Sequence, residues 1–220
     1  MPNRRSDATA SVRLGPRRAW LQGAAACIAT PWLVGHARAA DLPRFALGVA
    51  SGQPSASGMV LWTMLTGSNL PAQVPVQWEL ARDEAFTDIA ARGEEVADAT
   101  WAHSVHAEPS GLEPGRWYWY RFRALGQQST RGRTRTAPAP DDDATLNFAI
   151  ASCQRWDVGH YAAWRHMAAE QLDVVMFLGD YIYEYASPPG ALRQTEGLGF
   201  VSTLAQYRAR YATQIGRAHV

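Results

Sequence analysis

A continuous apolar run, Val174–Leu178, ends abruptly at Gly179 and Asp180. Such a run is typical of a strand that is buried on both faces of a parallel sheet. Upstream, residues 146–151 form another strand-like run, and residues 160–171 place apolar side chains at helical spacing. Strand, helix and strand in this order are the repeating unit of a parallel α/β sheet. The sequence therefore predicts the start of an α/β domain, over residues 145–214.

Candidate functional side chains follow both predicted strands. Cys153 comes shortly after residues 146–151, and Asp180 comes after the second run. Ligands of open α/β sheets gather at the carboxyl ends of strands, so we expect both side chains at one edge of the sheet. Gly179 allows the backbone to bend tightly before Asp180. A Gly-Asp pair at a strand end is commonly just a turn, and further residues are needed to indicate a metal site.

Cys153 and Tyr183 are those further residues. Cys153 is either a small buried apolar side chain or a metal-bound thiolate, and its polar neighbours favour the thiolate. Tyr183 lies among three tyrosines that follow Asp180, and a phenolate is a hard anionic ligand suited to a trivalent cation such as Fe³⁺. Gln154 and Glu184 are candidates for support of the ligands.

Short strands and turns dominate residues 40–136. Alternation of apolar and polar side chains is clear in Val76–Leu80 and in Trp117–Leu125. We expect Asp83–Ala91 to form at most a turn or two of helix. Several short strands at this spacing predict an immunoglobulin- or fibronectin-like β-sandwich.

Tyr118, Tyr120 and Phe122 share one face of the strongest predicted strand. We interpret this aromatic cluster as sandwich core rather than as a surface that stacks sugars or bases. The turn Leu112–Gly115 before Tyr118 resembles a tyrosine corner, in which the tyrosine hydroxyl bonds back to the upstream turn.

Residues 137–144 alternate alanine with proline and then carry three acids. This composition predicts a solvated linker. A calcium loop is the alternative, but the acids lack the EF-hand spacing.

The first residues read as an export signal. Arg17 and Arg18 precede an apolar stretch, and Ala37-Arg38-Ala39 is a small-x-small cleavage site. We predict a twin-arginine signal peptide over residues 1–39, with the twin-arginine translocation machinery as partner and a periplasmic or secreted location. An ordinary secretory signal is the alternative. The remaining residues, 40–220, are mildly acidic, which gives no support for nucleic-acid binding.

Several motifs together resemble the alkaline phosphatase D family: Ser152-Cys153-Gln154, Phe177–Glu184, Tyr207–Tyr211 and the opening Phe45–Gly52. The likeness covers roughly residues 13–213. The resemblance implies an α+β multidomain protein: a β-sandwich, then the start of a calcineurin-like metallophosphoesterase domain. It implies an Fe³⁺ and a Ca²⁺. Cys153 and Tyr183 would bind the iron, and Asp180 would bridge iron to calcium.

The function implied is metal-dependent hydrolysis of a phosphate ester by a monomer, and the substrate is a small monoester, a diester or a phospholipid. Family members continue with an Asp-Asp-His-Glu-like segment and further Asn, His and Asp residues that are absent here, so no catalytic residue is assigned. Residues 215–220 match what adapter DNA encodes, and we expect the 220-residue fragment to be inactive. The alternative is a non-enzymatic binding module in which a β-sandwich precedes a degenerate α/β remainder.

Overall fold

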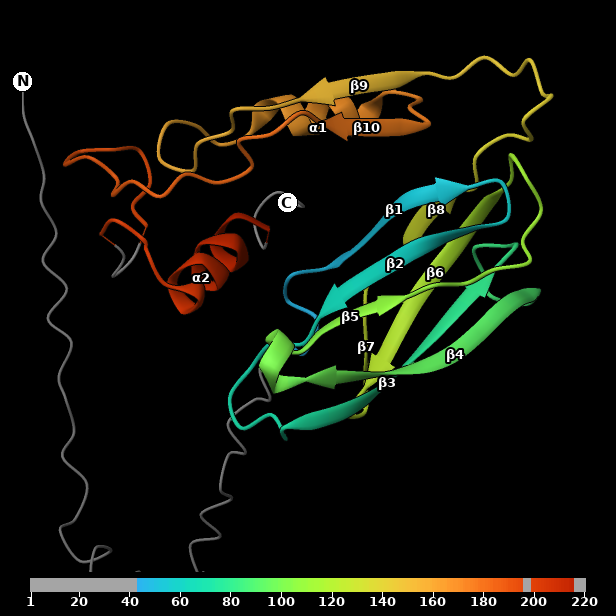
Figure 1. The fold of residues 1–220 in the computed structure, drawn as a ribbon, viewed down its shortest axis with the longest axis horizontal. Helices are drawn as coiled ribbons and strands as arrows, with labels where there is room; N and C mark the ends of the chain where they lie inside the picture. Colours follow the sequence, from blue (N-terminus) through green and yellow to red (C-terminus); the bar gives the residue numbers. More distant parts are fainter. Residues whose placement is uncertain (1–42, 196–198, 216–220) are drawn as a thin grey trace, which may run out of the picture. The chain divides into compact units, whose positions relative to one another are not determined.

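The structure, a computed structural model, describes residues 43–195 and 199–215 (Figure 1). The predicted signal peptide, residues 1–39, lies outside the described residues. Of the suspected artefact at residues 215–220, the structure describes Ile215 alone, as the last residue of a helix. No helix within the described ranges is long and apolar enough to cross a membrane.

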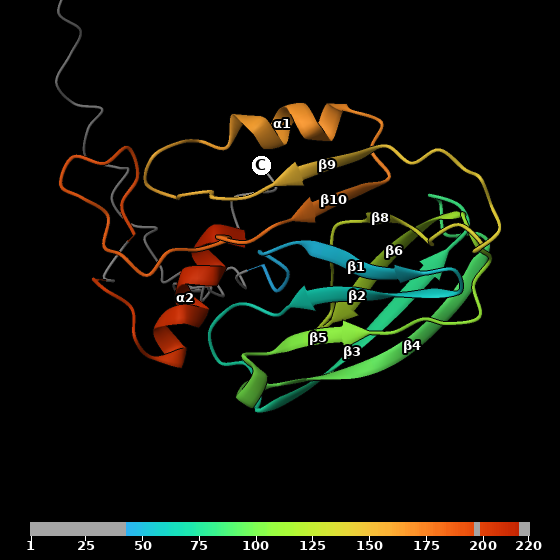
Figure 2. The same ribbon diagram turned by 45° about the horizontal axis from the view of Figure 1, so that its top comes forward.

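Two antiparallel sheets form a sandwich, and Figure 2 shows them as separate layers. One sheet has the order β1-β2-β5 and the other β4-β3-β6-β7, with β8 also paired to β6. The strands of the first sheet are β1 (Val49–Ser55), β2 (Gly58–Met64) and β5 (Ser104–Ala107). Those of the second are β3 (Gln73–Ala81), β4 (Ile89–Asp98), β6 (Trp117–Ala124), β7 (Gln127–Gln128) and β8 (Gly132–Arg135). A single 3₁₀ turn, η1 (Ala99–Trp101), follows β4.

The inward faces of both sheets build one hydrophobic core. On β6, Tyr118 and Phe122 are fully buried, as the alternation predicted, and Leu80 on β3 and Leu61 on β2 join them. This confirms that the aromatic cluster is sandwich core. Burial of each such side chain contributes about 1.5–3 kcal/mol.

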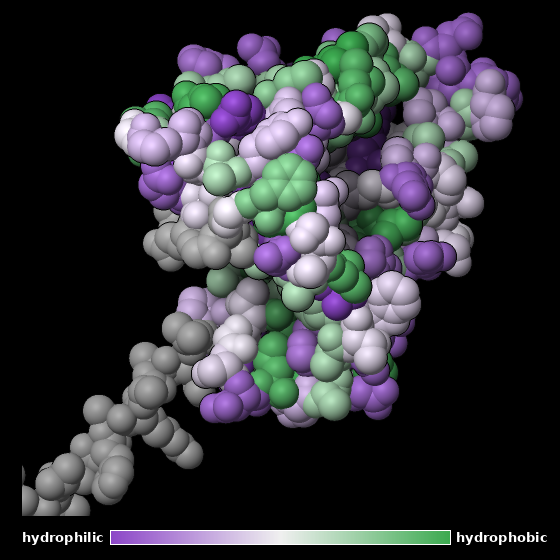
Figure 3. Space-filling view, turned by 60° about the vertical axis from the view of Figure 1, so that its left-hand side comes forward, coloured by the Kyte–Doolittle hydropathy of each residue, from purple (hydrophilic) through white to green (hydrophobic). Residues whose placement is uncertain are grey.

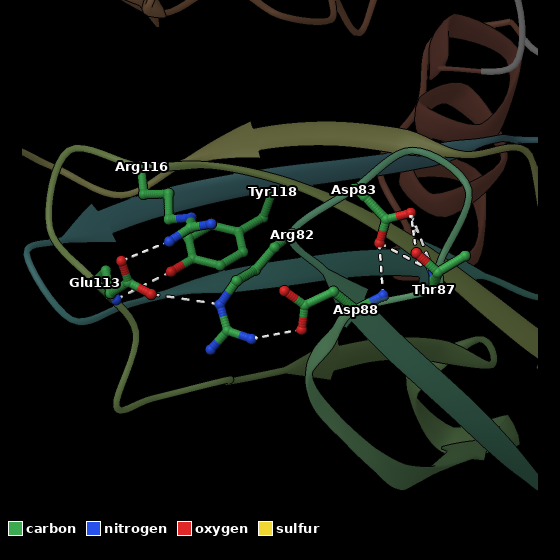
Figure 4. Close-up of polar contacts among 7 residues, drawn as sticks. All are labelled: Arg82, Asp83, Thr87, Asp88, Glu113, Arg116 and Tyr118. Atoms are coloured by element: carbon green, nitrogen blue, oxygen red, sulfur yellow. Dashed lines mark hydrogen bonds and ion pairs between the residues drawn. The ribbon is translucent and has the colours of Figure 1, made fainter.

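The tyrosine corner is also present. The backbone N–H of Glu113 donates to the hydroxyl of Tyr118 at 3.0 Å, so the tyrosine bonds back to the turn before its strand (Figure 4). Around this bond, the Glu113 carboxylate pairs with Arg116 at 2.6 Å and with Arg82 at 3.3 Å. These ion pairs are partly exposed, so each adds little to stability.

Residues 83–88 form a turn without helix, within the limit expected for Asp83–Ala91. The last residues of that range, 89–91, instead belong to strand β4, which was not predicted. Asp83 begins a turn in which its carboxylate accepts the backbone N–H groups of Thr87 and Asp88, and β4 starts at Ile89. This strand lies at the edge of its sheet and pairs with β3 alone. An edge strand that is half-exposed and charged shows no strong apolar alternation, which explains the miss.

After residue 147 the chain forms the predicted strand–helix–strand unit. Strands β9 (Phe148–Ala151) and β10 (Val174–Phe177) pair in parallel, with Phe148 opposite Val174. Helix α1 (Ala162–Ala169) lies between them in sequence, and α2 (Leu204–Ile215) follows. This confirms the start of an α/β domain after the sandwich.

Burial of β10 differs from the sequence expectation. The predicted strand is buried on both faces, yet Phe177 is 44% exposed and Leu178 is 66% exposed. The reason is that the parallel sheet has two strands among the described residues, too few to cover their own apolar side chains. Figure 3 shows one face of the molecule, on which hydrophobic residues, in green, lie between hydrophilic ones, in purple.

Candidate metal centre

The carboxyl ends of β9 and β10 carry strained backbone. Cys153, shortly after β9, has a φ of 55°, and Asp180, shortly after β10, has a φ of 50°. Gly179 between β10 and Asp180 has a φ of 121°, which glycine alone adopts readily. A residue with a Cβ in the left-handed region costs about 1–3 kcal/mol, and such residues gather at functional sites. Both positions that the strand-end argument predicted thus have left-handed backbone, as do seven other non-glycine residues of the described ranges.

The three predicted metal ligands meet at one carboxylate oxygen. The Cys153 thiol lies 3.5 Å from Oδ2 of Asp180, and the Tyr183 hydroxyl donates to the same oxygen at 3.1 Å. Because β9 and β10 are parallel neighbours, their carboxyl ends meet at one edge and bring Cys153 to Asp180. This convergence was expected from sequence, whereas the role of the three side chains in metal binding stays a prediction.

The proton on Tyr183 is held firmly in this arrangement. Loss of solvent, together with the neighbouring Cys153 and Asp180, raises the pKa of Tyr183 to about 12. Near neutral pH the phenol therefore keeps its proton and donates a hydrogen bond to the carboxylate. A phenolate at this position would need a cation close by to compensate its charge.

The donor set suits a metal, although it is not a cluster of the usual four residue types. Within the described ranges no three His, Cys, Asp or Glu side chains are arranged so that they could hold a metal ion. Here a tyrosine completes the group: one sulfur and two oxygen donors, each of which becomes anionic on deprotonation. Thiolate, phenolate and carboxylate are all donors that bind metal cations, so the three side chains together fit a metal ion.

Gln154 and Glu184 do not touch these donors in the described structure. The Gln154 side chain turns to α1, where its Oε1 accepts the indole N–H of Trp164 at 2.8 Å. The Glu184 backbone carbonyl accepts the N–H of Val201 at 2.9 Å. Their predicted support of the ligands stays untested, and the contacts seen join the strand-end loops to neighbouring segments.

Arg155, Asp157 and Arg210, to which the sequence analysis assigned no role, lie around Tyr183. Arg155 grips the buried carboxylate of Asp157 through two hydrogen bonds, at 3.0 and 2.6 Å, and its guanidinium lies 5.9 Å from the centre of the Tyr183 ring. Arg210 on α2 contacts the backbone carbonyls of Tyr183 and Tyr185. Arg155 and Asp157 stand close to Cys153 in the sequence, and Arg210 belongs to the Tyr207–Tyr211 motif, to whose arginines the sequence analysis gave no role.

Fold and site together define a class: an antiparallel β-sandwich followed by a parallel α/β unit with thiol, carboxylate and phenol gathered at its strand ends. Two family profiles match the chain in the same order. The PhoD-like phosphatase N-terminal domain matches residues 29–138, and the PhoD-like phosphatase domain matches residues 148–219. The chain belongs to the PhoD-like phosphatase family.

Individual relatives agree with this assignment. Alkaline phosphatase D of Bacillus subtilis (strain 168) is 47% identical, over 76% of this chain and 31% of the relative. A solved structure described as that of PhoD matches with a TM-score of 0.76 and 43% identity, over 81% of this chain and 36% of the other. The resemblance and the two-domain fold predicted from sequence are thus confirmed. The chain spans about a third of the length of these relatives.

Proposed function

We propose that this chain is the sandwich and the first part of the catalytic domain of a phosphoric ester hydrolase. The observation that carries the proposal is the meeting of Cys153, Tyr183 and Asp180 at one carboxylate oxygen, in a chain of the PhoD-like phosphatase family. Folding alone does not require a thiol, a phenol and a carboxylate to converge on backbone in the left-handed region. We therefore attribute their convergence to metal binding.

In this proposal Cys153 and Tyr183 hold an Fe³⁺ ion, and Asp180 bridges it to a Ca²⁺ ion. Calcium takes oxygen ligands, so Asp180, and not Cys153, would hold it. When bound, the two cations supply Lewis acidity to a phosphoryl group and to a water. The three side chains themselves position these charges at the edge of the sheet, and Asp180 accepts hydrogen bonds from the thiol and the phenol in the metal-free chain.

The substrate that fits this chemistry is a phosphate ester, either a small monoester or diester or a phospholipid. Three donors do not fill the coordination shell of either cation, so the proposed site needs further ligands beside Cys153, Asp180 and Tyr183. We therefore expect the 220-residue form to be inactive on nitrophenyl phosphate. Sequencing the gene through and beyond codon 214 tests the hydrolase proposal. A reading frame that continues into a stretch rich in Asp, His and Asn supports it, because such residues could supply the further ligands.

Metal binding is tested directly by spectroscopy. Ferric iron added to the purified protein is expected to give a visible thiolate or phenolate charge-transfer band, and Tyr183→Phe and Cys153→Ser are expected to remove the corresponding part of it. A colourless protein that releases all its iron on gel filtration would instead favour the binding-module alternative.

We further propose that residues 1–39 direct export through the twin-arginine machinery, and that the protein acts as a monomer in the periplasm or outside the cell. A fusion of residues 1–39 to a reporter tests the route. Replacement of Arg17 and Arg18 by lysine is expected to keep the reporter inside the cell if the twin-arginine machinery is used, and to leave export intact if the route is the general secretory one.

A further inference from the structure

We propose that Arg210 is a positioning residue of the candidate metal centre: from α2 it holds the backbone that presents the Tyr183 phenol to Asp180. The consequence for metal binding rests on the proposed function. The structural part, that Arg210 fastens this backbone, stands independently of it.

Tyr183 needs such a device because no regular element places it. Cys153 and Asp180 are located by the ends of β9 and β10, but the residues from Leu178 to Thr203 that the structure describes form no helix or strand. A side chain in such a segment keeps a fixed position only when tertiary contacts hold its backbone. The contacts that hold Tyr183 in place are therefore those made to its own main chain.

Arg210 makes those contacts. Its Nη1 donates to the carbonyl oxygen of Tyr183 at 3.2 Å and to that of Tyr185 at 2.8 Å. Its Nη2 donates to the carbonyl oxygen of Gly199 at 3.2 Å. One guanidinium thus joins two passes of the same segment, one beside the phenol and one shortly before α2. The planar fork of arginine allows this, whereas the point charge of lysine does not.

A backbone hydrogen bond closes the same loop. The N–H of Val201 donates to the carbonyl oxygen of Glu184 at 2.9 Å, and Glu184 lies between the two carbonyl groups that Arg210 binds. Val201 is fully buried. The exchange rate of its amide hydrogen therefore reports whether the two passes stay together.

The surroundings of Arg210 are those of a specific site rather than of a surface cation. The side chain is 5% exposed, and burial lowers its pKa while the nearby Asp157 carboxylate raises it. Asp157 is in turn bound by Arg155, which lies against the Tyr183 ring. A buried arginine is tolerated when charge and hydrogen bonds compensate it. Here the Asp157 carboxylate supplies the charge, and the carbonyl groups of Tyr183 and Tyr185 accept the hydrogen bonds.

The first test measures hydrogen exchange at Val201 in the metal-free protein. Arg210→Gln is expected to speed exchange of this amide by at least about tenfold, because the two passes separate more often. The matched control is Arg208→Gln, which removes the same charge from the same helix but loses a bond to the carbonyl of Thr100 instead. Exchange at Val201 in this control is expected to stay within about twofold of the unmodified protein.

Exchange at Ser129, whose buried N–H bonds to Phe122 within the sandwich, shows that the rest of the fold is intact. If Arg210→Gln leaves Val201 exchange unchanged while Ser129 also stays protected, the inference is overturned, whatever the protein does with metals. If the variant does not fold, Arg210→Lys provides the second test. It keeps the charge but not the fork, and is expected to show the same selective loss of protection at Val201.

The second test asks whether the held backbone matters to the site. With ferric iron, Arg210→Gln is expected to lose the phenolate band at least about fivefold more than the thiolate band, because Cys153 is placed by β9 and not by Arg210. A purely structural arginine would lower both bands together or neither, and that outcome overturns the positioning role. If the unmodified protein itself gives no band, the proposed metal centre fails, and the Val201 result alone decides the role of Arg210.

Discussion

The hydroxyl of Tyr183 lies 3.1 Å from Oδ2 of Asp180, three residues earlier in the chain, and the Cys153 thiol approaches the same oxygen from another strand. Proximity in sequence explains the first contact, and parallel pairing of β9 with β10 explains the second. Oδ2 of Asp180 thus takes part in one contact within its own segment, with Tyr183, and in one contact with a distant segment, through Cys153.

Removal of the shared carboxylate is the most direct test of this arrangement. Asp180→Asn is expected to weaken ferric binding by at least about 100-fold, since an amide cannot supply the negative charge that a trivalent cation requires. Isothermal titration or competition with a chelator measures the change. Asp142→Asn, in the exposed acidic run of residues 141–143, is the control and is expected to bind iron normally. Equal affinity in both variants would exclude Asp180 as a ligand.

The tyrosine corner makes a prediction about stability. Tyr118→Phe keeps the buried ring but leaves the N–H of Glu113 without the hydroxyl, and we expect a loss of about 1–2 kcal/mol in the free energy of unfolding. Urea denaturation followed by tryptophan fluorescence measures it. Tyr207→Phe, on the exposed part of α2, removes a hydroxyl from a side chain that is 37% exposed and should change stability by less than about 0.5 kcal/mol.

The close contact between β8 and β6 predicts that Gly132 cannot be replaced. A Cβ at Gly132 would run into the ring of Tyr120, which is 2% exposed and has no room to move. Gly132→Ala is expected to destabilise the sandwich by about 1–3 kcal/mol. Gly52→Ala is the matched control, because nothing lies within 4 Å of a Cβ at that position of β1. A tolerated Gly132→Ala would show that Tyr120 packs differently.

Acid stability is predicted to depend on Asp98. Its carboxylate accepts hydrogen bonds from Thr100 and from Gln73, at 2.7 to 2.9 Å, and these bonds lower its pKa from 3.8 to about 2. Because the folded pKa lies below the ordinary value, the stabilisation is fully present above about pH 4 and is lost as the pH falls towards 2.

The measurement is the difference in unfolding free energy between the unmodified protein and Asp98→Asn as a function of pH. We expect this difference to be constant from pH 7 to about pH 5 and to shrink below about pH 4. Asp142→Asn again serves as the control. A difference that does not vary with pH would mean that the carboxylate charge is irrelevant to the turn after β4.

Several elements could be predicted from sequence because their signals are local. Alternation in β3 and β6 identified their inward faces, and the turn before Tyr118 announced the tyrosine corner. β4 escaped prediction because an edge strand, most of whose residues are only partly buried, needs no apolar alternation. Apolar–polar alternation in a sequence thus indicates that one face of a strand is buried, and a strand without such a buried face does not show it.

For the site, sequence by itself named the three candidate donors, Cys153, Asp180 and Tyr183, and predicted the juxtaposition of two of them. Cys153 and Asp180 follow strands that the βαβ pattern requires to be parallel, so their meeting is a consequence of topology. Only the tertiary structure decided how Tyr183 reaches them. It sits in a segment without regular structure, and the guanidinium that holds its backbone comes from Arg210, which is buried on a later helix. A hydrogen bond from a distant side chain to a main-chain carbonyl leaves no pattern in the sequence, because every residue has that carbonyl.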